Sequence, residues 1–158
     1  MTKSNFERMI QLADKSFDAR HDPDQLDVNE NAIKKLHLLH PATLSEFNEG
    51  TGPLVWILII PTPEDLMKQF LKNKINEKKL LDLTPLNVSY DCIYLCSAMV
   101  LPEYRGKGIA KRLTIEAIEA IQKTHNIKTL FVWPFSKEGE RLAESISKTT
   151  GLKLLKKK

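Results

Sequence analysis

Four basic residues surround two glycines in one segment of the sequence, where the pattern predicts a strand, a turn and a helix. The basic residues are Arg105, Lys107, Lys111 and Arg112, and the glycines are Gly106 and Gly108. The start of a helix carries a partial positive charge and N–H groups without partners, so a cluster of cations there is unfavourable until a polyanion binds. Glycine lets the backbone approach phosphate oxygens closely. The segment therefore predicts a site for a phosphate-containing ligand.

Two common phosphate-binding motifs are excluded by the residues present. A P-loop that ended at Gly106-Lys107 would require glycine at position 101 and serine or threonine at position 108, where the chain has Leu101 and Gly108. A dinucleotide-binding turn that began at Gly106 would require a third glycine, and that position is Lys111. Another phosphate-containing ligand is expected.

The same segment resembles the acetyl-CoA loop of the GNAT N-acetyltransferase superfamily. The sequence Arg-Gly-Lys-Gly-Ile-Ala at 105–110 is a common form of that loop, and Val100, Pro102 and Tyr104 precede it at the spacing found in the family. The resemblance covers residues 90–155, whereas residues 1–85 carry no family signal and are more helical than the usual start of this fold.

The resemblance implies an α/β (α+β) fold with a central mixed sheet flanked by helices, here with a helix-rich N-terminal part. It also implies acetyl-CoA as cosubstrate. Backbone N–H groups of 105–110 would bind the pyrophosphate, and the strand at 98–100 would pair with the pantetheine arm. The cofactor-binding residues expected on this basis are Ala98, Met99, Val100, Arg105, Gly106, Lys107, Gly108, Ile109, Ala110 and Lys111.

The activity implied by the resemblance is direct transfer of an acetyl group from acetyl-CoA to a primary amine of a small molecule or peptide. The sequence identifies neither the acceptor nor the general acid and base. Ser147 occupies the position of the tyrosine that often protonates the leaving thiolate, and Glu140 replaces an asparagine that often contacts the coenzyme. A non-catalytic module of the same fold, which binds an acyl-CoA or a protein partner, is the alternative.

Composition and charge narrow the kinds of partner and the cellular location that we expect for the protein. The chain has 158 residues and a net charge of +4, of which Lys156, Lys157 and Lys158 supply three, and a nearly neutral body argues against a nucleic-acid surface. No stretch approaches the roughly 20 apolar residues of a membrane helix, and the N-terminus has no apolar signal core. We expect a cytoplasmic protein without a membrane partner.

The cysteines and histidines do not predict a metal site. Cys92 and Cys96 would lie on one face of a strand about 13 Å apart, beyond the roughly 7 Å that a disulfide spans, so free thiols are expected. The histidines, which show no metal-ligand spacing, are His21, His37, His40 and His125.

Residues 1–85 predict helices around one strand. A capping box, Ser4 to Glu7, begins a helix whose apolar stripe is Phe6, Met9, Ile10, Ala13 and Phe17. A second capping pattern at 27–30 begins a helix that ends before Pro41, and a short helical turn is expected around 44–47. An apolar strand at 54–60 is covered on both faces. Thr62 is then expected to cap a helix, and Asn76 a short continuation.

Residues 86–155 are expected to form the acetyl-CoA-binding half. The predicted elements are a strand at 87–100, a helix at 109–123, a strand at 128–133, a helix at 136–149 that ends at Gly151, and a strand at 152–155. We expect residues 1–158 to form one domain. The short last strand offers an edge through which two copies of the chain can pair as a homodimer.

Overall fold

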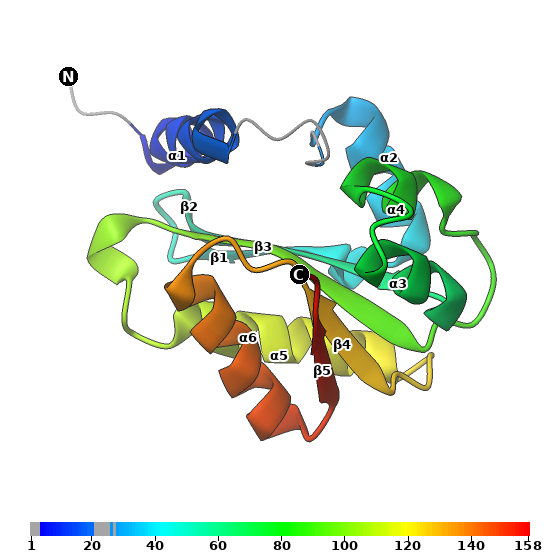
Figure 1. Ribbon diagram of the computed structural model, residues 1–158. Coiled ribbons are helices and arrows are strands. Elements are labelled where there is room, and N and C mark those ends of the chain that lie inside the picture. Colours follow the sequence, from blue (N-terminus) through cyan, green and yellow to red (C-terminus); the bar gives the residue numbers. More distant parts are fainter. Residues whose placement is uncertain (1–3, 21–25, 27) are drawn as a thin grey trace.

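The computed structural model describes residues 4–20, 26 and 28–158, and among these it shows six α-helices around one five-stranded sheet (Figure 1). The helices are α1 (Asn5–Arg20), α2 (Glu30–Leu39), α3 (Glu64–Leu71), α4 (Glu77–Leu83), α5 (Ile109–Gln122) and α6 (Lys137–Thr150). The strands are β1 (Leu44–Asn48), β2 (Pro53–Thr62), β3 (Cys92–Val100), β4 (Thr129–Val132) and β5 (Lys153–Lys156). Short 3₁₀ turns cover Pro41–Thr43 and Pro102–Tyr104. The predicted mixed sheet flanked by helices is confirmed.

The sheet has the strand order β1-β2-β3-β4-β5 and mixed directions. β1, β2 and β3 pair antiparallel, whereas β3, β4 and β5 pair parallel. Helices α1 to α4 lie on one face of the sheet and α5 and α6 on the other (Figure 1). This two-sided cover explains β2, in which every residue except Trp56 is buried, as its apolar sequence without alternation predicts.

The pairing between β3 and β4 stops part of the way along β3. β3 contacts β4 only at Cys92, Ile93 and Tyr94, although β3 continues to Val100 along β2. The second half of β3 therefore has one edge without a strand partner. A β-bulge at Cys96 falls at the same point, because Leu58 pairs with Ser97 and Ile59 with Leu95. A bulge bends its strand and increases the local twist, which fits the divergence of β3 from β4.

The structure corrects three boundaries in the N-terminal half. The helical turn expected around 44–47 is wrong: these residues form β1, which pairs with β2 as a hairpin. Thr62 is not a helix cap, because β2 continues through it and its buried hydroxyl lies 2.7 Å from that of Thr84. β3 begins at Cys92 rather than at 87, because Asn87 has a left-handed φ of 60° that interrupts extended backbone.

The predicted apolar stripe of α1 is only partly buried. Met9 is fully buried, but Phe6 is 56% exposed and Ile10 40% exposed. The side chain of Ser4 accepts a hydrogen bond from the N–H of Glu7, as the capping box predicts. The cap of α2 is Asn29, whose side chain accepts from the N–H of Ala32.

Asp27, which was expected to cap α2, lies outside the described residues, and so does His21. The later helices α3, α4, α5 and α6 and the last strand lie where the sequence places them, and Asn76 and Gly151 flank α4 and α6 as predicted.

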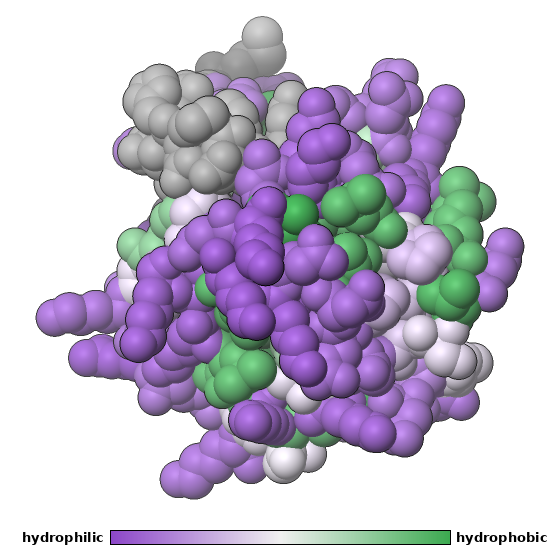
Figure 2. Space-filling model, turned by 45° about the vertical axis from the view of Figure 1, so that its right-hand side comes forward, coloured by the Kyte–Doolittle hydropathy of each residue, from purple (hydrophilic) through white to green (hydrophobic). Residues whose placement is uncertain are grey.

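The surface is mostly hydrophilic on the face shown in Figure 2, and its apolar side chains gather in small separate patches. Among the described helices, none has the length and apolar character that crossing a bilayer requires. Cys92 and Cys96 are thiols and do not form a disulfide with each other, as expected.

His40 gives the fold a testable pH dependence. Its Nδ1 accepts a hydrogen bond from the N–H of Ala42, which requires the neutral ring, and burial together with the nearby His125 lowers the pKa of His40 below its ordinary value. The stabilisation is complete above the unfolded pKa of about 6.5 and is lost as pH falls through the folded pKa. We expect the urea concentration at the midpoint of unfolding to be lower at pH 5.5 than at pH 7.5.

The variant His40→Asn provides the control, because an asparagine oxygen can accept from the same N–H without titrating. Its urea midpoint is expected to change less than that of the wild type over this interval. An equal fall in both proteins would show that other groups cause the pH dependence.

Candidate active site

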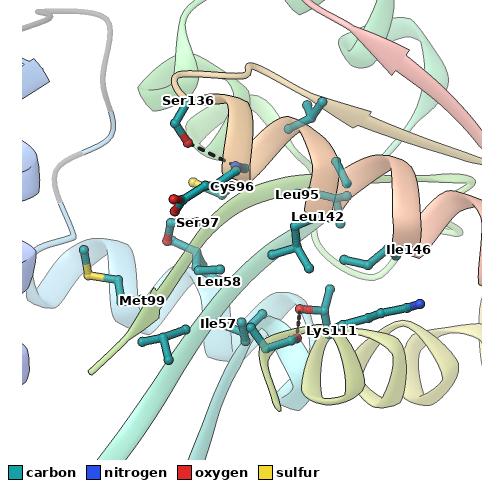
Figure 3. A pocket seen from close by; sticks show the side chains of 18 of the residues that line it. Ile57, Leu58, Leu95, Cys96, Ser97, Met99, Lys111, Ser136, Leu142 and Ile146 are labelled. Atoms are coloured by element: carbon teal, nitrogen blue, oxygen red, sulfur yellow. Dashed lines mark hydrogen bonds between the residues drawn. The ribbon is translucent and has the colours of Figure 1, made fainter. Parts of the chain in front are cut away.

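A cavity of about 600 Å³ opens along the unpaired edge of β3, where β3 and β4 diverge (Figure 3). This volume lies within the range of roughly 300–1,000 Å³ that is usual for small-molecule sites. Its walls come from β2, β3, the end of β4, the first turns of α5 and the inner side of α6, and α1 contributes Leu12. Much of the lining is apolar, and the side chains of Ile57, Leu58, Leu95, Leu142 and Ile146 surround the space (Figure 3).

The glycine-rich turn forms one end of the cavity. Gly106 and Gly108 both have a φ of 76°, in the left-handed region that glycine adopts without steric cost, and Gly108 lies directly before α5. The N–H groups of Gly106 and of residues 108–111 have no acceptor in the described part of the chain, whereas Lys107 follows a hydrogen-bonded turn at 105–106, and the first helical hydrogen bond comes from the N–H of Arg112 to the carbonyl of Gly108. N–H groups without acceptors at a helix start can bind an anion.

The basic side chains of this segment divide into two groups. Arg105 and Lys111 line the cavity, and Arg105 Nε donates to the carbonyl of Val100 at 3.2 Å. Lys107 lies outside the lining, with its Nζ 5.4 Å from the centre of the Tyr104 ring. Arg112 also lies outside, against the ring of Phe47 at 5.7 Å.

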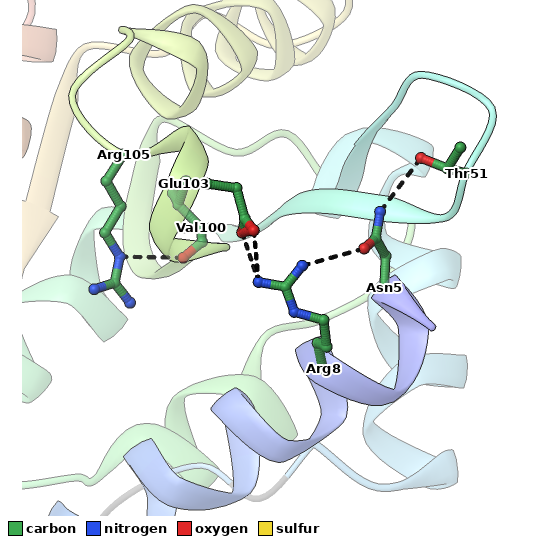
Figure 4. A network of polar contacts seen from close by, with 6 residues as sticks. All are labelled: Asn5, Arg8, Thr51, Val100, Glu103 and Arg105. Carbon is green, nitrogen blue, oxygen red and sulfur yellow. Dashed lines mark hydrogen bonds and ion pairs between the residues drawn. The ribbon is translucent and has the colours of Figure 1, made fainter. Parts of the chain in front are cut away.

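Glu103, the nearby acid, does not neutralise this group of cations. Its carboxylate accepts two hydrogen bonds from Arg8 of α1, at 2.6 and 2.8 Å (Figure 4). The hydrogen bond from Arg8 lowers the pKa of Glu103. Asn5 extends the same network by donating to Thr51 at 3.4 Å. The N-terminal helix therefore binds the acid that precedes the turn, and the turn keeps its positive charge.

The structure brings together nine of the ten predicted cofactor-binding residues on one cavity; Lys107 is the exception. The nine are Ala98, Met99, Val100, Arg105, Gly106, Gly108, Ile109, Ala110 and Lys111. Whether they bind acetyl-CoA stays a prediction.

Neither Ser147 nor Glu140 lines the cavity. The hydroxyl of Ser147 donates to the carbonyl of Leu152 at 2.6 Å, and Glu140 lies 3.7 Å from the ammonium group of Lys156. Both side chains thus make local contacts within the C-terminal part of the fold.

Sequence reasoning missed other polar groups near the cavity. Glu138, in the first turn of α6, is the acidic residue of the lining, and the aromatic residues Trp133 and Phe135 lie in the segment between β4 and α6 with ring centres 4.2 Å apart. Acidic residues in a first helical turn are common for electrostatic reasons alone, so this signal is weak. Glu138 becomes a candidate only when the fold places it opposite β3.

A buried carboxylate behind β3 was also missed. Glu77, on α4, is 1% exposed. Its Oε1 accepts from the N–H of Leu26 at 2.7 Å, and its Oε2 accepts from the Tyr94 hydroxyl and from Cys96 Sγ at 3.7 Å. Cys96 in turn lines the cavity. In the sequence, Glu77 follows the cap Asn76 among several lysines, which is typical of a solvated helix start.

The two thiols are expected to react differently, because Cys92 is buried and Cys96 lines the cavity. Burial, and next the charge of Asp91, raises the pKa of Cys92 to about 12. Roughly one Cys92 in 10⁴ is then a thiolate at pH 8. Iodoacetamide at pH 8 should alkylate Cys96 in the native protein and leave Cys92 intact, as peptide mass spectrometry can measure. Equal labelling of both thiols would contradict this arrangement.

Part of the chain, including the strand and the turn that line the cavity, is similar to a known protein family. Residues 70–142 match the family model described as the acetyltransferase (GNAT) family, a segment that includes α4, β3, the glycine-rich turn, α5, β4 and the start of α6. The expectation that residues 1–85 carry no family signal is therefore wrong for residues 70–85. No curated protein matches the chain. The five-stranded mixed sheet with helices on both faces agrees with the GNAT fold. The resemblance to the GNAT acetyltransferase family found in the sequence is thus confirmed over residues 70–142.

Proposed function

We propose that the chain binds acetyl-CoA in the β3 cavity and transfers the acetyl group directly to a primary amine. The observation that carries the proposal is the set of five N–H groups, at Gly106 and at 108–111, that have no acceptor in the described part of the chain and lie next to Arg105 and Lys111 at one end of the cavity. A diphosphate would provide acceptors for these groups and complement their charge. The match to the GNAT family model at 70–142 supports acetyltransferase chemistry at this site.

The unpaired edge of β3 supports the placement of the rest of the cosubstrate. Residues 98–100 lie beside the cavity on a strand segment that β4 does not cover. Such an edge can pair with the amide groups of an extended ligand as an added strand does. Acetyl-CoA supplies an activated thioester, so the protein's contribution is to hold it, exclude water and orient the amine.

The acceptor end of the cavity supports an amine. Its lining is largely apolar, and Glu138 is its acidic group. A carboxylate there can attract an ammonium group and orient it towards the strand. Trp133 and Phe135 offer aromatic surface for the carbon chain or for a cation.

Two glycines provide a matched test of acetyl-CoA binding. Gly108 and Gly151 have nearly equal φ values of 76° and 75°, and an added Cβ would meet nothing within 4 Å at either. Gly108→Ala and Gly151→Ala should each destabilise the fold by about 1 kcal/mol, because both force alanine into the left-handed region. Of the two glycines only Gly108 lines the cavity, so a Cβ there would occupy space next to the proposed diphosphate, and calorimetry should show acetyl-CoA affinity reduced more than about tenfold in Gly108→Ala alone.

Equal affinities in the two glycine variants would contradict the proposed position of the diphosphate. Thermal unfolding of both proteins serves as the control, because it separates a loss of binding from a loss of folded protein.

The alternative function, a module that binds an acyl-CoA without turnover, is motivated by the absence of tyrosine at 147. A thiol-release assay with simple amines, polyamines and lysine-containing peptides distinguishes the two. We expect release of free coenzyme A with at least one class of primary amine and, at the same time, a product heavier by one acetyl group by mass spectrometry. Binding of acetyl-CoA without release on any amine would favour the module.

A further inference from the structure

The structure contains a buried carboxylate, that of Glu77, to which the proposed function assigns no role. Glu77 is 1% exposed and forms no ion pair with any side chain in the described part of the chain. Its partners are one backbone N–H, from Leu26, and two β3 side chains, the hydroxyl of Tyr94 and the thiol of Cys96. A carboxylate buried without a cation is costly, and uncharged donors only partly offset that cost.

The location of Glu77 links it to the cavity. Tyr94 is the last β3 residue that pairs with β4, and Cys96 is the bulge residue where the cavity begins. Glu77 therefore reaches the point where β3 separates from its neighbour. Cys96 has the carboxylate on one side, 3.7 Å from its Sγ, and the cavity on the other.

A purely structural role would be to connect α4 to β3 and to residue 26. That role needs the Leu26 and Tyr94 hydrogen bonds only. It does not account for the thiol between the carboxylate and the cavity, at the end where the lining is apolar and a proton acceptor within the protein would be useful.

We propose that Glu77 is the proton acceptor of the transfer and acts through the thiol of Cys96. This inference rests on the proposed function and adds the proton acceptor that the family motif does not identify in this chain. Cys96 is the group that contacts the amine, and Glu77 positions the thiol and stores the proton.

The proton balance is complete without another reactant. The ammonium group of the acceptor gives one proton to Cys96 Sγ while the thiol proton passes to Glu77 Oε2. The neutral amine attacks the acetyl carbon, so a C–N bond forms and the thioester C–S bond breaks. The sulfur of coenzyme A leaves with the electron pair and takes the second proton of the amine nitrogen. Glu77 releases its proton to solvent before the next turnover.

The first test is the pH dependence of thiol release by the full chain, with acetyl-CoA and the most rapidly acetylated amine of the panel. Glu77→Gln retains the side-chain volume and an oxygen for the Leu26 N–H. We expect its kcat to fall at least about 100-fold, the usual effect of losing a general base, with the KM for acetyl-CoA within threefold. Its rate should then rise continuously with pH, because hydroxide must deprotonate the amine. Glu116→Gln, on the exposed side of α5, is the matched control for loss of one carboxylate.

Substitutions of Cys96 test the relay without altering Glu77. Cys96→Ala should reproduce the Glu77→Gln profile, whereas Cys96→Ser should recover part of the rate because a hydroxyl can pass on a proton. These variants also cover the case in which Glu77→Gln does not fold. Alanine as active as serine would overturn the relay.

A second test needs no acceptor amine. The rate of Cys96 alkylation by iodoacetamide is measured against pH in the wild type and in Glu77→Gln. If Glu77 is ionised and thus able to accept a proton, its removal should move the midpoint to lower pH, because a neighbouring negative charge disfavours the thiolate. An unchanged midpoint would show that Glu77 already holds a proton, which overturns the proposal.

The outcomes separate this inference from the function on which it rests. Failure of the wild type to bind acetyl-CoA, or binding without turnover, overturns the proposed function and this inference with it. Normal turnover in Glu77→Gln overturns this inference alone. So does a pH profile in which the fall of kcat towards low pH disappears in Glu138→Gln and persists in Glu77→Gln.

Discussion

The site depends on one constraint of the sheet: β3 pairs with β4 over three residues and then continues alone on that edge. The core enforces this arrangement. Tyr94 and Phe131 stack at 5.1 Å at the last pair, and Phe70 contacts both rings from α3. Beyond that cluster, β4 leads into Trp133 and α6, whereas the bulge at Cys96 turns β3 towards the glycine-rich turn. The divergence creates a cavity whose wall includes strand backbone without a strand partner.

The N-terminal half completes the site, although it carries no recognisable motif. Leu12 of α1 lines the cavity, and Arg8 of the same helix binds Glu103 just before the turn. Glu77 reaches β3 from α4. Helix α1, which lies outside the family match at 70–142, thus supplies part of the cavity wall and a charge partner, whereas α4, which lies within that match, supplies a buried carboxylate. If residues 98–111 bind the cosubstrate as proposed, differences in this half are where acceptor preference would arise.

The sequence predicted the elements whose signals are local. The glycines at 106 and 108 locate the turn before α5, the apolar run at 54–60 identifies β2, and the caps Ser4 and Asn76 lie where expected. Its errors occur where a tertiary partner decides. β1 is a strand because the edge of β2 accepts it, and Thr62 extends β2 because Thr84 pairs with its hydroxyl. Glu77 resembles a solvated helix residue until the fold brings Tyr94 and Cys96 to it.

The two ends of the cavity differ in a way that suits the two parts of a coenzyme thioester. The glycine-rich end is exposed and carries fixed N–H groups together with Arg105 and Lys111. Salt screens the exposed cations, but it weakens directed hydrogen bonds from the backbone much less, so the backbone provides the more dependable part of anion binding. The other end is apolar around Leu58, Leu95 and Leu142, where charge is expensive and a proton must move between neighbouring groups rather than through water. A thiol backed by a carboxylate is one of the few arrangements that can accept a proton there without placing a permanent charge in the cavity itself.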